Sequence, residues 1–391
     1  MTEAITTSGP NTSRPVLRMG VVVACILLLA VIAGCLWTHG WLMRSGEYLD
    51  LDKIVEQQQK SRDILFAAKL ADRTFYYKQE IYRQRKPDIV ALGSSRLLSL
   101  RQEHFSQPFA NLSGMTTLAE TAEIANSLFE QSPPKHVILG IDPWWFHPLE
   151  NKRHISRSGP VRIFLITDLL HALASGRITS SAHIGLQARQ TGNGYAFDGS
   201  YLPQGLFTGV NVPQEAGFDA ALRQKENATG PFLQGSDISE AQWVRLQELI
   251  LFLKEKDIAV TILLPPVAPD LTSAFLVDEL AYIQKLRWML QEMTAERNTA
   301  FFDYTDGNVT GLSNCEFIDA LHPGEIALQR VLLDMAIANS NIRDIVKLAD
   351  IGYNIATYAG QASTLEGEWD YLRMGCKKKT KQEKRIPDEN R

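Results

Sequence analysis

The chain of 391 residues has only four cysteines and no excess of basic charge. Four cysteines are too few for a disulfide framework. The net charge of −4 lacks the basic footprint of a nucleic-acid-binding protein. No group of His, Cys and Asp has the spacing of a metal site, and no glycine-rich phosphate loop precedes a helix. The sequence therefore predicts no metal, no cofactor and no nucleic-acid partner.

Charge is also missing from one long segment near the N-terminus. Residues 19–37 read MGVVVACILLLAVIAGCLW, a length that matches the roughly 20 residues needed to cross a bilayer. Arg14 and Arg18 precede the segment, so the positive-inside rule places residues 1–18 in the cytoplasm. We therefore expect a single-pass anchor over 19–43 in the inner (cytoplasmic) membrane, with everything beyond it in the periplasm or an equivalent space.

Two processing alternatives stay open for this segment. Ile32-Ala33-Gly34-Cys35 resembles the end of a bacterial lipoprotein signal, in which Cys35 would be lipidated, and simple cleavage is the other alternative. The residues after Cys35 remain apolar, however, and Trp37 and Trp41 are typical of the outer end of a membrane span. An uncleaved signal anchor is the favoured interpretation, and all three alternatives export the rest of the chain.

The far end of the chain differs in composition. Residues 346–391 form a C-terminal extension whose basic run, 376–385, reads CKKKTKQEKR. Such a run is typical of a solvated tail, with anionic lipid or a polyanionic polymer as the alternative partner. Cys315 and Cys376 are the two cysteines outside the apolar segment, and an oxidising compartment would allow them to pair.

Short buried runs and helical periodicities alternate between residues 85 and 345, as in a parallel sheet with crossover helices. Residues 46–84 before them have helical spacing and predict a stalk or a packing helix. The expected strands are 88–92, 136–141, 258–264 and 300–303, and the expected helices are 117–129, 242–256, 276–293 and 323–338. The pattern predicts a three-layer α/β/α, doubly wound parallel sheet. It lapses between about 150 and 235, which we interpret as an irregular insertion that caps the working crevice.

In a sheet of this kind, ligands bind beyond the carboxyl ends of the strands. The first expected strand runs directly into Gly93-Ser94-Ser95-Arg96. A small residue there allows a sharp turn, and the next residue can present a hydroxyl at the start of a helix, where backbone N–H groups favour negative charge. Helix capping is the other role open to such serines.

A second group of chemistry-bearing residues lies far downstream, in Asp319-Ala320-Leu321-His322-Pro323. Spacing of three lets the carboxylate of Asp319 reach Nδ1–H of His322, which leaves Nε2 as a base. Pro323 fits the first position of the final helix. A surface turn with a helix cap would read the same, but the chain order of serine, aspartate and histidine, each at a strand end or sheet edge, favours a catalytic triad.

With these residues, the chain resembles the SGNH/GDSL hydrolase superfamily, with Ser94 in place of the aspartate of the G-D-S motif. More specifically, the layout resembles the teichoic-acid D-alanine transfer and alginate O-acetylation families, which carry an N-terminal anchor, a G-S-S turn and a late D-x-x-H. The stretch 142–146, DPWWF, is similar to the S-P-Q-W-F stretch of the D-alanine transfer family. The resemblance covers roughly residues 85–340 and implies a flavodoxin-like SGNH fold.

The resemblance implies roles for individual residues. Ser95 is the expected nucleophile with Ser94 as its alternative, His322 the general base and Asp319 the carboxylate that orients it. The backbone N–H groups of Ser95 and Gly114 would form the oxyanion hole. The remaining expected oxyanion or substrate-binding residues are Asn111, Arg96, Asp142, Trp144 and Trp145, where the tryptophans are either core residues or a wall on which a sugar stacks.

One departure from the family pattern affects the function. SGNH enzymes usually place an asparagine in the oxyanion hole, whereas this chain has Asp142 after Gly140, and a carboxylate would repel an oxyanion unless it is turned away or protonated. We expect an O-acyltransferase or esterase that acts on a cell-envelope glycan, with acetyl as the expected acyl group. The resemblance implies a multi-spanning membrane O-acyltransferase as partner. The alternative is an inactive SGNH-like module that binds polysaccharide or serves as a scaffold in an export complex.

Overall fold

The structure is a computed structural model, and it describes residues 13–68, 70, 72–149, 170–171, 174–175, 185–189, 192–203, 218–275, 280–296, 299–307 and 311–365. The basic tail, including Cys376, lies outside the described residues, as does most of the predicted insertion. Cys315 is disulfide-bonded, and Cys25 and Cys35 are free thiols.

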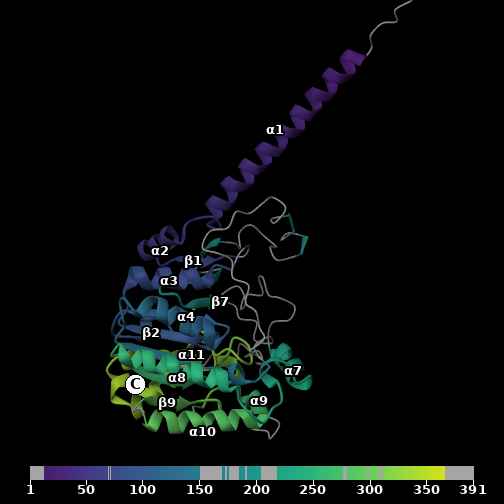
Figure 1. Cartoon of the computed structure of the whole chain (residues 1–391). Coiled ribbons are helices and arrows are strands. Elements are labelled where there is room, and N and C mark those ends of the chain that lie inside the picture. Colours follow the sequence, from purple (N-terminus) through teal and green to yellow (C-terminus); the bar gives the residue numbers. More distant parts are fainter. Residues whose placement is uncertain are drawn as a thin grey trace, which may run out of the picture.

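The centre of the molecule is a parallel sheet of five strands in the order β3-β2-β4-β8-β9 (Figure 1). Its strands are β2 (Ile89–Ser94), β3 (Phe109–Met115), β4 (His136–Gly140), β8 (Ala259–Leu264) and β9 (Ala300–Asp303). Four of these strands were predicted from their apolar runs. The sequence analysis did not predict β3, although it named Asn111 and Gly114 of this segment as expected site residues. The chain order reverses between β2 and β4, and in such sheets this is the point where ligands bind.

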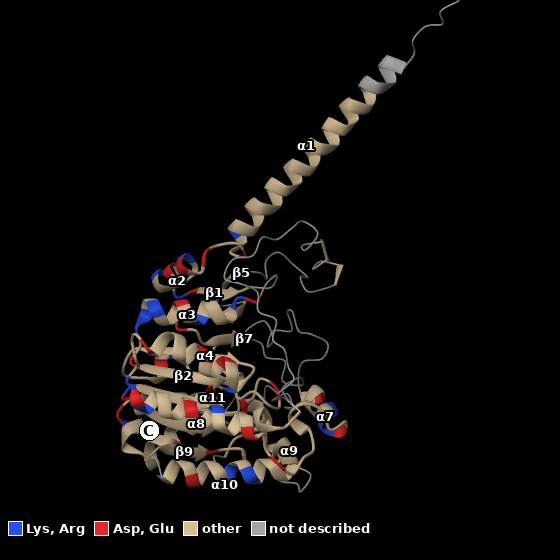
Figure 2. Cartoon of the chain, viewed as in Figure 1, with Lys and Arg blue, Asp and Glu red and all other residues tan. Residues whose placement is uncertain are grey.

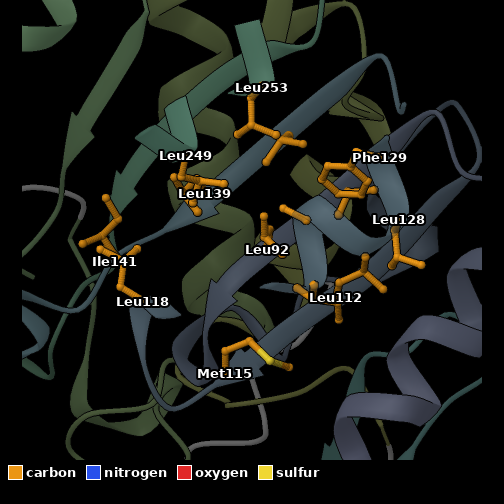
Figure 3. Packing of buried hydrophobic residues seen from close by; sticks show 14 of the residues in the cluster. Leu92, Leu112, Met115, Leu118, Leu128, Phe129, Leu139, Ile141, Leu249 and Leu253 are labelled. Atoms are coloured by element: carbon orange, nitrogen blue, oxygen red, sulfur yellow. The ribbon is translucent and has the colours of Figure 1, made fainter. Parts of the chain in front are cut away.

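Alternate residues of each strand pack on opposite faces of the sheet because side chains alternate along a strand. On one face, Leu92, Leu112 and Leu139 of adjacent strands pack against helix residues such as Phe129 and Leu249 (Figure 3). The helices of this face are α3 (Thr74–Arg85), α4 (Leu118–Phe129), α8 (Glu240–Glu255) and α10 (Ala281–Glu296).

The other face carries Ile89, Ala91 and Ile138, which pack against three C-terminal helices. These are α11 (Glu325–Ala338), α12 (Ser340–Arg343) and α13 (Leu348–Tyr358). The predicted final helix therefore begins two residues later than expected. Pro323 is not its first residue, because it forms an isolated bridge with Phe317 and Gly324 caps the helix.

Residues 46–84 are built into the body of the protein. They form α2 (Leu51–Lys60), β1 (Ile64–Ala67) and α3, and Ile54 and Val55 of α2 belong to the main core cluster. The helical spacing predicted through Ile64 and Leu65 was wrong at that point, because both residues lie in a strand. The prediction failed because the partners of β1 come from more than a hundred residues downstream.

Those partners form a second, antiparallel sheet in the order β5-β1-β6-β7. Its other strands are β5 (Gly185–Ala188), β6 (Asn193–Tyr195) and β7 (Tyr201–Pro203). They belong to the predicted insertion. Two further elements of that insertion are described, α7 (Phe218–Glu226) and the short 3-10 helix η6 (Gly230–Phe232).

The N-terminal helix α1 (Ser13–Ser45) projects from the body (Figure 1). It is the one helix of the described chain that is long and apolar enough to cross a membrane, over Met19–Ser45. Along this span Figure 2 shows charge only at the end that meets the body, where Arg44 lies. The chain thus has a single N-terminal helix with the length and composition of a membrane anchor.

The last turn of α1 belongs to the packing of the body. Leu42 is 1% exposed, and the positive-φ residue Gly46 lies against Leu186 of β5. Glu47, directly after the helix, accepts hydrogen bonds from the backbone N–H groups of Gly185 at 3.0 Å and Leu70 at 3.3 Å. The helix and the body are therefore joined by packed side chains and buried hydrogen bonds, with no free linker between them.

Candidate active site

The turn after β2 requires glycine at position 93. Gly93 has φ +103°, and a Cβ added there would lie 2.2 Å from the carbonyl oxygen of Gly140 on β4. This close approach lets β2 end in a sharp turn, and the 3-10 helix η1 (Ser95–Leu97) follows at once. Ser94 caps η1, because its Oγ accepts a hydrogen bond from the N–H of Arg96 at 3.1 Å.

The two serines of the turn have different environments. Ser95 Oγ lies 3.0 Å from Nε2 of His322, although the two residues are 227 positions apart in the chain. Ser94 is buried and donates its hydroxyl hydrogen to Oδ1 of Asp142 at 2.7 Å. Ser95 is therefore the hydroxyl placed beside an imidazole base, and Ser94 holds the turn.

His322 lies on a tight loop between Phe317 and Pro323, closed by a hydrogen bond from the N–H of Ile318 to the carbonyl oxygen of His322 at 2.9 Å. Its Nδ1 lies 2.9 Å from Oδ2 of Asp319. Oδ1 of the same carboxylate accepts hydrogen bonds from the backbone N–H groups of Leu321 and His322, both at 2.8 Å. The D-x-x-H spacing thus orients the ring as the sequence predicted.

The charges of this pair support each other. Burial lowers the pKa of His322, but the neighbouring Asp319 carboxylate outweighs burial and holds that pKa above its usual value. Burial raises the pKa of Asp319, yet the imidazole and the hydrogen bonds to the loop bring that pKa below its usual value. An ionised Asp319 beside Nδ1 of His322 is the arrangement that stabilises the imidazolium formed during proton transfer.

Arg96 joins four loops at the carboxyl end of the sheet. Its guanidinium is buried and donates to the carbonyl oxygen of Leu321 from Nε at 3.1 Å, to Asp142 from Nη1 at 3.4 Å and to the carbonyl oxygen of Pro265 from Nη2. These contacts tie the serine turn to the ends of β4 and β8 and to the histidine loop. Arg96 lines the cavity, but its three donor nitrogens are engaged by protein groups.

Asn111 does not line the cavity. Its amide nitrogen donates to the carbonyl oxygens of Leu97 at 2.8 Å and Leu100 at 2.9 Å, and its Oδ1 accepts from the N–H of Ser113 at 3.0 Å. The structure therefore places the side chain as a support below the serine turn, away from the expected oxyanion or substrate contact. Gly114, three residues further along β3, has φ +104° and lies against Leu98.

A cavity of about 260 Å³ opens above Ser95 and His322. Asp142, Trp144 and Trp145 line it, together with Thr116, which directly follows β3, and three residues of the predicted insertion: Gln224, Gly230 and Pro231. Trp145 is 3% exposed and belongs to the main core, while Trp144 is only half-buried, with the Arg96 guanidinium 5.3 Å from its ring centre. Trp144 is thus the aromatic wall and Trp145 a core residue at its edge.

Two carboxylates that the sequence analysis missed support the histidine loop from outside. Glu316, at its start, pairs with Arg330 at 3.0 Å and accepts from the N–H of Gly360 at 2.9 Å. Glu325, at its end, pairs with Arg101 at 3.0 Å and accepts from the N–H of Thr364 at 3.0 Å. The C-terminal segment 360–365 therefore holds both ends of the loop. No motif indicated this, because each contact joins residues far apart in the chain.

No protein-family model and no curated protein matches the sequence of this chain. Among the described residues, no group of three or more His, Cys, Asp or Glu side chains is placed to hold a metal ion.

Proposed function

We propose that the chain is a membrane-anchored, serine-dependent O-acyltransferase or esterase of the SGNH type that acts on a cell-envelope glycan. The observation that carries the proposal is the relay of Ser95 Oγ, 3.0 Å from His322 Nε2, with His322 Nδ1 2.9 Å from Asp319. A serine next to a base that is itself oriented by a third group is the general arrangement of an activated nucleophile.

The fold is consistent with this proposal. When the five parallel strands are numbered along the chain, their order in the sheet is 2-1-3-4-5. This is the strand order of flavodoxin-like three-layer folds. Ser95 and Asp142 follow the two strands between which this order reverses. The site thus occupies the position where ligands bind in doubly wound sheets, which supports an SGNH-like architecture.

The proposed reaction has two steps. Ser95 Oγ attacks the carbonyl carbon of an ester while His322 Nε2 takes its proton. The tetrahedral intermediate collapses to an acyl-serine, and the departing alcohol receives the proton from His322. A sugar hydroxyl or water then gives its proton to His322 and attacks the acyl-serine, which releases a new ester or a free acid and restores the serine. Backbone N–H groups at Ser95 and Gly114 are the proposed oxyanion donors.

Cellular placement and partners are part of the same proposal. Arg14 and Arg18, which precede the apolar span of α1, favour a cytoplasmic N-terminus and a periplasmic body. Activated acyl donors are cytoplasmic, so an external transferase requires a membrane partner that moves acyl groups outward. A multi-spanning O-acyltransferase would supply this step, and an acetyl group on a glycan hydroxyl is the expected product.

Fluorophosphonate labelling of the full-length protein tests the proposal. We expect a covalent adduct on the wild type, none on Ser95→Ala, and strongly slowed labelling of His322→Ala. Ser127→Ala, an exposed serine of α4, is the matched control and should label like the wild type. A folded wild-type protein that forms no adduct would instead favour the non-catalytic, polysaccharide-binding module, for which the carboxylate of Asp142 beside the serine is the motivating observation.

A further inference from the structure

Asp142 presents a carboxylate oxygen to the cavity. The residue is 4% exposed, and its Oδ1 is occupied by the hydroxyl of Ser94 at 2.7 Å and the guanidinium of Arg96 at 3.4 Å. Within the described part of the chain, Oδ2 of Asp142 has no hydrogen-bond partner. It is also not one of the fully buried polar atoms that lack a partner, so it keeps some solvent exposure. Because Asp142 lines the cavity, Oδ2 is the atom that opens into it.

Burial raises the pKa of Asp142, while the Arg96 guanidinium and the hydrogen bond from Ser94 act against this effect and favour the ionised form. An ionised carboxylate oxygen accepts hydrogen bonds and cannot donate them. A ligand group that meets Oδ2 must therefore be a donor. Arg96 lies close enough to balance much of the charge of Asp142, so a neutral donor fits without leaving an unpaired charge, whereas an ammonium group would add one. A hydroxyl group is the neutral donor that an envelope glycan offers in quantity.

The walls of the cavity agree with a hydroxyl-bearing ligand. The residues that line the cavity beside Ser95 include the half-buried Trp144 and two polar residues, Thr116 and Gln224. Its volume of about 260 Å³ is just below the range usual for drug-sized ligands. The cavity therefore holds the ester group and the few sugar or polyol carbons bonded to it. A hydroxyl on a carbon adjacent to the ester is then the donor that can reach Oδ2 of Asp142.

We propose that Asp142 binds a free hydroxyl adjacent to the ester linkage, so that the site selects esters of sugars or polyols whose neighbouring hydroxyl is unmodified. This inference rests on the proposed esterase or transferase function. It also accounts for an aspartate where an oxyanion donor would be expected, because the carboxylate contacts the alcohol part of the substrate and leaves the oxyanion to backbone N–H groups.

The test compares two acetylated methyl pyranosides, one with a free hydroxyl next to the acetate and one with that hydroxyl replaced by hydrogen. The full-length wild type in detergent should hydrolyse the hydroxyl-bearing ester with a kcat/KM about 10- to 100-fold higher, as expected for a hydrogen bond to a charged group. Equal rates for the two esters would overturn the inference, and this comparison requires no variant.

Asp142→Asn makes the test more specific, because it replaces the hydrogen-bond acceptor that faces the cavity by a donor of nearly the same size and shape. The amide oxygen would take over the contacts with Ser94 and Arg96, and the amide nitrogen would turn a donor toward the cavity. We expect the hydroxyl preference, which is the ratio of the two kcat/KM values measured on the same variant, to fall to near unity. Asp237→Asn, a surface aspartate paired with Lys285, is the matched control and should keep the preference.

The outcomes separate the two proposals. No Ser95-dependent hydrolysis of p-nitrophenyl acetate would overturn the proposed function, and the inference with it. Hydrolysis of that ester together with a preference that survives in a folded Asp142→Asn protein would overturn the inference alone. So would a stronger preference for an aminoacyl ester than for the hydroxyl-bearing one, since that would identify an ammonium group as the ligand of Asp142.

Discussion

Replacing Gly93 by alanine should disrupt both the sheet and the candidate site. The added Cβ would lie 2.2 Å from the carbonyl oxygen of Gly140, about 0.8 Å inside the 3.0 Å below which such contacts essentially never occur. The neighbour is backbone of a central strand and cannot rotate away. The positive φ costs roughly 1–2 kcal/mol for a residue with a Cβ, and overpacking typically adds about 1–3 kcal/mol. We expect a loss of about 2–5 kcal/mol in the free energy of unfolding.

The same shift should reach the chemistry, because Ser95 follows Gly93 by two residues. A shift of the turn by the roughly 0.8 Å needed to relieve this overlap would stretch the 3.0 Å contact between Ser95 and His322, and a misplacement of about 1 Å costs about 100-fold in rate. Urea denaturation gives the stability through the midpoint and slope, and the rate of fluorophosphonate labelling gives the site geometry.

Gly352→Ala is the matched control for this substitution. Gly352 is exposed inside α13, with nothing within 4 Å of an added Cβ, so alanine there should be neutral or stabilise by up to about 1 kcal/mol. If Gly93→Ala unfolds within about 0.5 kcal/mol of wild type and labels at the same rate, the argument that the turn depends on glycine is refuted.

Three further predictions concern charged groups. The pKa of His322 lies above its usual value because Asp319 outweighs the effect of burial; labelling should therefore rise as pH increases through that pKa, and Asp319→Asn should move the rise to lower pH and slow labelling by about 100-fold or more, which an unmoved pH profile would contradict. Burial lowers the pKa of Lys78 from 10.5 to about 7. Between these values the unfolded chain binds the extra proton, so the stability of wild type relative to Lys78→Met should increase by about 1 kcal/mol per pH unit from pH 7 to 9 in urea titrations, and a flat difference would be evidence against a buried amine. Arg96→Lys should slow labelling by at least about 10-fold, because one ammonium cannot span the oxygens of Leu321, Pro265 and Asp142, and a wild-type rate would exclude a positioning role.

Local patterns predicted the elements whose neighbours are close in sequence or whose runs are uniformly apolar. Strands β2 and β4 are buried throughout and β8 is buried in all but its first residue, and α4 begins after a capping threonine, Thr117, as its periodicity indicates. β3 escaped prediction because it contains Asn111, Ser113 and Gly114 among its apolar residues. The asparagine serves the serine turn through hydrogen bonds to Leu97 and Leu100, so a functional demand hides the strand pattern.

The candidate site divides in the same way. The contact between Asp319 and His322 could be predicted from their spacing. The choice between Ser94 and Ser95 could not be predicted, because it depends on which hydroxyl faces Asp142 and which faces His322. The general rule that strand ends meet at one edge brought Ser95 and His322 together as a hypothesis. The supporting role of Arg96 depends on carbonyl oxygens 169 and 225 residues away, which no sequence pattern records.

The packed junction between α1 and the body also has a mechanical consequence. The exposed part of the helix, Met19 to Trp37, spans about 28 Å at 1.5 Å per residue, close to the roughly 30 Å of a hydrocarbon core. Below it, Thr38 and Leu42 are already buried in the body. A helix joined to the body in this way has no flexible linker. In a bilayer the cavity would therefore stay at a fixed distance from the membrane surface, and its orientation would change only when the helix tilts.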